Sequence, residues 1–220
     1  MNIKGLPYRT VWVEYPDIEP LCKKIGAAPT HSVAAPYTLP VIHDPAHNAV
    51  VSESIEIARY LDRTYPDTTP LLPDGSQALQ EAFQIAHIKT VMEASYLIML
   101  PLSGAKLNPV SEAYFRRNRE RRFGMKMEEF SPLGPTRDGH WNNLREQYGV
   151  LAGWMAKNEK GPFVMGEQIS YADISVAGAL IWMRTVFGVE SAEWKDVLTW
   201  KNGRWASYMN EIERYEQITE

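Results

Sequence analysis

Alternating hydrophobic residues predict a strand near the start of the chain, over residues 8–15. Val11, Val13 and Tyr15 fall on one side of this segment, which is the two-residue period of a half-buried strand. Most of its side chains are aromatic or β-branched, which also favours a strand. Pro16 follows directly, so the strand is expected to end there.

A short helix and a hairpin are predicted next. Residues 18–25 have a helical pattern, and Gly26 stands just past their end, where glycine commonly closes a helix. Residues 27–36 are rich in proline, alanine and serine and are expected to form a loop. Two short apolar runs, 38–43 and 49–51, predict strands. The segment DPAHN between them has turn chemistry, so the pair is expected to form a hairpin.

Pro40 falls inside the first strand of this hairpin. Because proline has no backbone N–H to donate, this strand must bend, lie at a sheet edge or present open backbone groups to something else. A helix is predicted to follow over residues 52–65, and Pro66 ends it. The apolar stripe of this helix consists of Ile55, Ala58, Leu61 and Tyr65.

The rest of the chain is predicted to be all-helical. Residues 65–75 are rich in proline and turn-forming residues and are the best linker candidate. We therefore divide the chain into a domain over residues 1–72 and a second domain over residues 76–220. The helices expected in the second domain cover residues 77–100, ending at Pro101, and then 111–130, 138–158, 170–187 and 203–217.

The helix over residues 170–187 is apolar almost all round, so it is expected to be the buried central helix of its domain. Ser170 and Asp173 have the spacing of a capping box, in which each side chain bonds the backbone N–H of the other residue. Ile169 and Ile174 flank this motif as a hydrophobic staple would. We interpret the motif as a folding signal rather than as a functional site.

The first residues have the pattern of a helix end. Met1 to Lys4 could form a last helical turn, with Gly5 as its terminating glycine. A single helical turn is not stable on its own because helix nucleation is unfavourable, so we expect a segment upstream of Met1 to have supported it.

Composition excludes several classes of protein. The chain has 220 residues, of which 45% are hydrophobic and 23% charged, as is usual for a globular protein with a substantial core. A net charge of −4 gives no electrostatic case for nucleic acid or an anionic membrane, and no apolar run approaches the roughly 18 residues that span a bilayer. The five histidines lack metal-ligand spacing, so no metal site is predicted. The single cysteine, Cys22, cannot form an internal disulfide and fits a reducing intracellular compartment.

A dense run of arginines stands near the middle of the chain. Its members are Arg116, Arg117, Arg119, Arg121 and Arg122. Such a run is compatible with nucleic-acid binding. However, Glu112 precedes Arg116 by one helical turn and further glutamates follow, so we favour a solvated or interface-facing helix.

Five long stretches are similar to one known family. They are KGLPYRTVWVEYPDIEPLCKKIGA, YTLPVIHDP, VVSESIEIARYLDRTYPD, NPVSEAYFRRNRERRFG and VMGEQISYADISVAGALIWMR. Together they resemble the fungal class A glutathione transferases, which are related to bacterial β-etherases. The resemblance implies a fold of class α/β plus all-α: a thioredoxin-like N-terminal domain, truncated at its start, followed by an all-helical C-terminal domain. It also implies a cytoplasmic homodimer that uses glutathione as co-substrate.

The resemblance assigns glutathione binding to two pairs of residues. At Leu39-Pro40 the peptide bond is expected to be cis, which would turn the Leu39 backbone toward the cysteinyl backbone of glutathione. At Glu53-Ser54 the carboxylate would pair with the γ-glutamyl ammonium, while the serine and the helix N-terminus would hold the α-carboxylate. The plainer alternatives are an edge-strand proline and an ordinary helix cap.

The residue that would activate the glutathione thiol has no counterpart in this sequence. In the family it is a serine at the start of the first helix, and the sequence resembles the family only from the last turn of that helix onward. We therefore assign no catalytic residue and leave open whether the chain is an enzyme. The implied reaction is conjugation or ether cleavage on an apolar, aromatic electrophile. Aromatic residues that could line its pocket, or only the core, are Tyr96, Tyr114, Phe115, Trp141 and Trp182.

Three alternatives to an active transferase remain. One is a non-catalytic protein that binds hydrophobic metabolites between the domains. Another is a transferase-like accessory protein of fungal secondary metabolism, and the third is the inactive product of a truncated gene.

Overall fold

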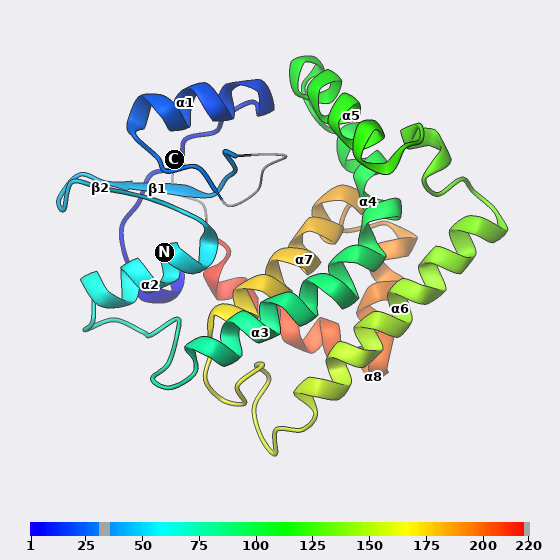
Figure 1. Cartoon of the computed structure of the whole chain (residues 1–220). Coiled ribbons are helices and arrows are strands. Elements are labelled where there is room, and N and C mark those ends of the chain that lie inside the picture. Colours follow the sequence, from blue (N-terminus) through cyan, green and yellow to red (C-terminus); the bar gives the residue numbers. More distant parts are fainter. Residues whose placement is uncertain (31–35, 218–220) are drawn as a thin grey trace.

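The structure is a computed structural model that describes residues 1–30 and 36–217. It has two lobes, which Figure 1 shows side by side: a small one with the hairpin and two helices, and a larger helical one. In the small lobe, strands β1 (Val41–Asp44) and β2 (Ala49–Ser52) pair antiparallel. Helix α2 (Ser54–Thr64) packs on this hairpin, with Ala58 and Leu61 of its predicted stripe buried and Ile55 and Tyr65 partly buried. Helix α1 (Ile18–Ile25) completes the lobe.

Most of the predicted elements of the small lobe are confirmed. Helix α1 has the predicted bounds and ends at Gly26, whose φ of 76° is left-handed. The hairpin forms as predicted, although its first strand begins only at Val41, directly after Pro40. The first residues form a short turn, η1 (Asn2–Lys4), closed by Gly5 at a φ of 65°.

The strand predicted over residues 8–15 is wrong. Residues 6–14 have no regular secondary structure, and Tyr15 already belongs to the short helix η2 (Tyr15–Asp17). Within the described residues, β1 and β2 are the only strands, and each pairs only with the other. The segment therefore has no backbone neighbour, and the side chains of Val11 and Trp12 are 61% and 72% exposed.

The larger lobe is helical, as predicted. Its helices are α3 (Gln77–His87), α4 (Glu93–Gly104), α5 (Pro109–Phe123), α6 (Pro135–Met155), α7 (Tyr171–Phe187) and α8 (Ala192–Ile212). Short segments complete it: η3 (Ile88–Met92), η4 (Met127–Glu129) and η5 (Glu213–Tyr215).

Several predicted helix bounds are wrong. The predicted helix over residues 77–100 is two helices joined by the π-helical segment η3, and Pro101 lies inside α4. The helix continues past this proline, and the Pro101 carbonyl accepts a hydrogen bond from the backbone N–H of Ala105, at 3.2 Å. Helix α5 ends at Phe123 because Gly124, with a φ of 71°, closes it.

The last helix begins eleven residues earlier than predicted. Helix α8 starts at Ala192, behind the capping side chain of Ser191, and breaks at residues 200–203. The break includes left-handed conformations at Lys201 and Asn202, with φ values of 52° and 58°.

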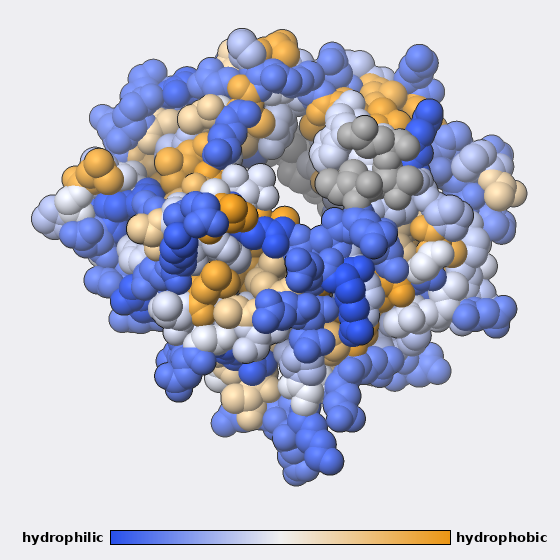
Figure 2. Space-filling model, turned by 180° about the vertical axis from the view of Figure 1, so that it is seen from behind, coloured by the Kyte–Doolittle hydropathy of each residue, from blue (hydrophilic) through white to orange (hydrophobic). Residues whose placement is uncertain are grey.

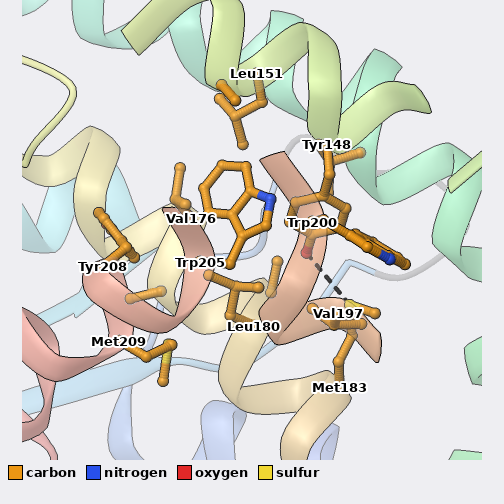
Figure 3. Packing of buried hydrophobic residues seen from close by; sticks show 14 of the residues in the cluster. Tyr148, Leu151, Val176, Leu180, Met183, Val197, Trp200, Trp205, Tyr208 and Met209 are labelled. Atoms are coloured by element: carbon orange, nitrogen blue, oxygen red, sulfur yellow. Dashed lines mark hydrogen bonds between the residues drawn. The ribbon is translucent and has the colours of Figure 1, made fainter. Parts of the chain in front are cut away.

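The core lies where α6, α7 and α8 meet. Figure 3 shows Trp205 in its centre, surrounded by Leu151, Val176 and Tyr208. Helix α7 is buried along most of its length, as predicted. Its capping box is also present, with Ser170 and Asp173 both fully buried. This core fixes the start of α7, which points toward the small lobe.

Candidate functional site

The hairpin brings the two predicted binding pairs together. Val41 pairs with Ser52, so the backbone that enters β1 runs beside the backbone that leaves β2. The Leu39–Pro40 peptide therefore lies next to Glu53 and Ser54. This peptide bond is cis, as the family resemblance implied, and Leu39 is 44% exposed.

Glu53 has an unusual backbone. Its φ of 70° and ψ of 123° lie outside the regions that a residue with a side chain normally occupies. Such a conformation costs about 1–3 kcal/mol and persists only where surrounding structure imposes it, often at ligand sites. Here it serves to turn the chain directly from β2 into α2, whose first backbone N–H groups have no helical acceptor.

Ser54, the first residue of α2, is held from the larger lobe. Its hydroxyl lies 2.7 Å from the hydroxyl of Tyr171, the first residue of α7. Burial raises the pKa of the Tyr171 phenol, so this group stays protonated and can donate. The Tyr171 backbone N–H also donates to the Leu71 carbonyl at 2.7 Å. The sequence analysis missed Tyr171, and its only signal was its place inside the capping box.

The capping box keeps Tyr171 in place. The Asp173 carboxylate accepts from the backbone N–H groups of Ser170, at 3.0 Å, and Val164, at 2.9 Å. It also accepts from the Tyr208 hydroxyl, at 3.2 Å. Burial raises the pKa of Asp173 although these hydrogen bonds oppose it. The start of α7 is therefore tied at once to its own core and to the small lobe.

A cleft of about 1830 Å³ opens beside the Leu39–Pro40 peptide. Figure 2 shows the molecule deeply hollowed between its lobes. The extended segment around Trp12 and the start of β1 form one side of the cleft, and α5 forms the other. Leu39 and Pro40 line this cleft, whereas Glu53 and Ser54 stand next to its lining, behind the hairpin end.

An acidic group in the cleft wall already has its partners. Asp44 accepts hydrogen bonds from the hydroxyls of Tyr60, at 2.7 Å, and Tyr65, at 2.6 Å, and contacts the His47 ring. The bond from Tyr65 is the main reason why the pKa of Asp44 falls well below its usual range. The same bond raises the pKa of Tyr65 to about 12. We interpret the group as a structural brace of the hairpin.

The segment that leads to α1 is anchored to α5. The Glu14 carboxylate accepts from the side chains of Asn108 and Ser111 at the start of α5, and these bonds lower its pKa. The Tyr15 backbone N–H donates to the Ser111 hydroxyl at 2.9 Å. The far wall of the cleft is therefore fixed relative to the small lobe.

Packing and ion pairs account for Cys22 and Arg116, respectively. Cys22 is buried, and burial raises the pKa of its thiol, which disfavours the reactive thiolate. Arg116 forms ion pairs with Glu112, Glu120 and Glu128, as expected of a solvated helix. No cluster of potential metal ligands occurs in the part of the chain that the structure describes.

Family models match nearly the whole chain. The model described as the glutathione S-transferase N-terminal domain matches residues 1–64, and that of the C-terminal domain matches residues 78–215. The chain belongs to the glutathione S-transferase family. Its fold class is the expected one, a thioredoxin-like domain followed by an all-helical domain.

Solved structures of this family are very similar to the chain. A glutathione S-transferase of Ceriporiopsis subvermispora, crystallised in complex with glutathione, is 45% identical, with a TM-score of 0.96 over 100% of this chain and 88% of its own. The transferase GSTFuA3 of Phanerochaete chrysosporium is 40% identical, with a TM-score of 0.91 and the same two coverages.

Among curated proteins, the glutathione S-transferase-like protein ustS of Aspergillus flavus is 29% identical to this chain. The match covers 92% of this chain and 76% of the length of ustS. The like-named protein OpS6 of Beauveria bassiana is 27% identical over 78% of this chain and 65% of its own. Among the described residues, no helix is both long and apolar enough to cross a membrane.

Proposed function

We propose that this chain binds glutathione at the junction of β1 and α2. The observation that carries the proposal is the convergence of the Leu39–Pro40 peptide and the strained residue Glu53 at one end of the hairpin. Two of the similar structures, at 45% and 43% identity, are described as complexes with glutathione, which supports the choice of ligand.

Each part of glutathione has a complementary group at this junction. Leu39 is an exposed residue, and its backbone would offer an N–H and a C=O to the cysteinyl unit, as in the addition of a short strand. The first N–H groups of α2 and the Ser54 hydroxyl suit the γ-glutamyl carboxylate. Glu53 supplies the negative charge that pairs with the ammonium.

The reaction proposed is conjugation, or glutathione-dependent ether cleavage, on an apolar aromatic electrophile held in the cleft. Membership of the fungal class A, a cytoplasmic location and a homodimer belong to the same proposal. Identities of 37% and 40% to two transferases named GSTFuA support the class.

A second candidate is non-catalytic binding of hydrophobic metabolites, including an accessory role in secondary metabolism. It is favoured by one observation: none of the described residues is assigned to activate the thiol. A turnover assay with an aryl ether and with a chlorodinitrobenzene electrophile separates the candidates.

Glutathione affinity tests the binding site. We expect Glu53→Gln to weaken binding by at least about tenfold, because it removes one charge-assisted contact worth about 1.5–3 kcal/mol and keeps the size of the side chain. Isothermal titration and retention on glutathione-agarose both measure this change. Glu56→Gln is the matched control, since Glu56 is exposed on the first turn of α2 and bonds Arg59. Equal affinity of wild type and Glu53→Gln would remove the site assignment.

A further inference from the structure

We infer that the aromatic second substrate of this chain carries, beside its apolar ring, an acidic group whose negative charge is received by Arg119 and Arg122 of α5. The inference rests on the proposed function in one respect: it takes the cleft beside Leu39 as the place where the second substrate binds. The charge of that substrate follows from the arginines themselves.

The arginines of α5 fall into two groups. Arg116 has three glutamate partners and accounts for the expected solvated face. Arg119, Arg121 and Arg122 line the cleft, and within the described residues none of them forms an ion pair. Glutamates therefore neutralise only one side of the arginine run.

Arg119 is the most constrained of these cations. Its guanidinium lies 4.5 Å from the ring centroid of Phe115, and its side chain is half-buried. Burial lowers the pKa of Arg119, and the neighbouring charge of Arg122 acts in the same direction. A partly desolvated cation without a carboxylate is costly to a folded protein, and a bound anion would remove that cost.

The acidic groups that line the cleft are already occupied. Among the described lining residues these are Glu19 and Asp44. Glu19 accepts from the ammonium of Lys23 at 2.6 Å, and Asp44 accepts from two tyrosines. Arg9 adds a further positive charge to the lining. The cleft therefore presents an excess of positive charge, although the whole chain is negative.

Aromatic rings surround the cations. Tyr15 is stacked on Tyr114 with ring centroids 6.4 Å apart, and it meets the edge of Phe115 at 5.4 Å. The guanidinium of Arg122 lies 5.8 Å from the ring centroid of Tyr96. A flat aromatic body fits against such rings, while its carboxylate, sulfonate or phenolate reaches the arginines. An apolar electrophile without a charge would leave the cations unpaired.

Two fluorescent probes of nearly the same shape test the inference. Anilinonaphthalene sulfonate carries one negative charge, and N-phenyl-1-naphthylamine is its uncharged counterpart. In titrations of the whole chain, we expect the anionic probe to bind at least tenfold more tightly. We expect Arg119→Gln to weaken binding of the anionic probe about tenfold and binding of the neutral probe less than twofold. The double variant with Arg122→Gln should abolish the preference.

Arg117→Gln is the matched control, because Arg117 lies on the same helix, is exposed and does not line the cleft. It should leave both affinities unchanged. Equal binding of the two probes by wild type, or an equal loss of both in Arg119→Gln, overturns the inference. The inference is also overturned if Arg119→Gln weakens glutathione binding but leaves binding of the anionic probe unchanged, since the arginine would then bind a glutathione carboxylate. If wild type is not retained on glutathione-agarose but still prefers the anionic probe, only the proposed function is contradicted.

Discussion

His87 is a buried polar side chain without a partner. It is 2% exposed, its Nε2 atom forms no hydrogen bond, and its ring stacks on Phe83 with centroids 6.1 Å apart. Burial lowers the pKa of His87 to about 4, because the charged form loses its hydration. The residue therefore makes the free energy of unfolding depend on pH.

The sign of this dependence follows from the two states. The unfolded chain takes up a proton near the ordinary histidine pKa of about 6.5, whereas the folded chain resists it until about pH 4. We therefore expect acidification from pH 7 to pH 4 to remove roughly 3 kcal/mol of stability through this residue. Urea unfolding at both pH values should show a smaller loss in His87→Leu than in wild type. His43→Gln, which changes an exposed histidine, should lose as much as wild type.

Single residues differed in how well the sequence predicted them. Leu39-Pro40 and Glu53-Ser54 could be assigned because each pair stands in a long stretch that is similar to the family. Tyr171 could not, because its contact with Ser54 crosses 117 positions of sequence and no local pattern encodes it. The separation of Arg116 from Arg119 also required the structure, since only the helix orientation decides which arginine faces the cleft.

At the scale of elements, helix α7 depends on the carboxylate of Asp173. We expect Asp173→Ala to destabilise the fold by about 3–5 kcal/mol, because it leaves several buried donors unsatisfied at the start of the central helix. Denaturant unfolding measures the change. Glu167→Ala is a suitable control, since Glu167 is exposed a few residues earlier, and it should stay within about 0.5 kcal/mol of wild type. A similar small change in Asp173→Ala would mean that the box is dispensable.

Two element boundaries with clear local end signals were predicted well. Helix α1 closes at Gly26 and α7 opens at Ser170, and both boundaries were correct. The segment over residues 8–15 has strand periodicity but no partner strand. The strand prediction failed there because periodicity shows which side chains share a face and not whether a partner strand exists. The break in α8 depends on left-handed Lys201 and Asn202, which have no sequence signature as clear as glycine.

At the scale of the whole molecule, Asp62 of α2 joins the small lobe to the linker. Its carboxylate accepts from the buried ammonium of Lys4 at 2.6 Å. It also accepts from the backbone N–H groups of Leu71, at 3.0 Å, and Leu72, at 2.7 Å. The Leu71 carbonyl in turn accepts a hydrogen bond from the backbone N–H of Tyr171 in the larger lobe. One carboxylate thus organises the contact through which the candidate site is held between the lobes.

Asp62→Ala should therefore loosen one lobe without unfolding the other. The substitution leaves the buried Lys4 ammonium without a counter-ion, with only the Thr69 carbonyl to accept from it, and two backbone donors unsatisfied. We therefore expect hydrogen-exchange protection in α2 and the hairpin to fall by about 2–4 kcal/mol. The centre of α7 packs against α6 and α8, where Asp62 makes no contact, and its protection should not change. Asp67→Ala, an exposed change in the adjacent linker, should alter neither region. If protection in α7 fell as far as in α2, the two lobes would unfold as one cooperative unit, and Asp62 would stabilise the whole chain rather than its small lobe.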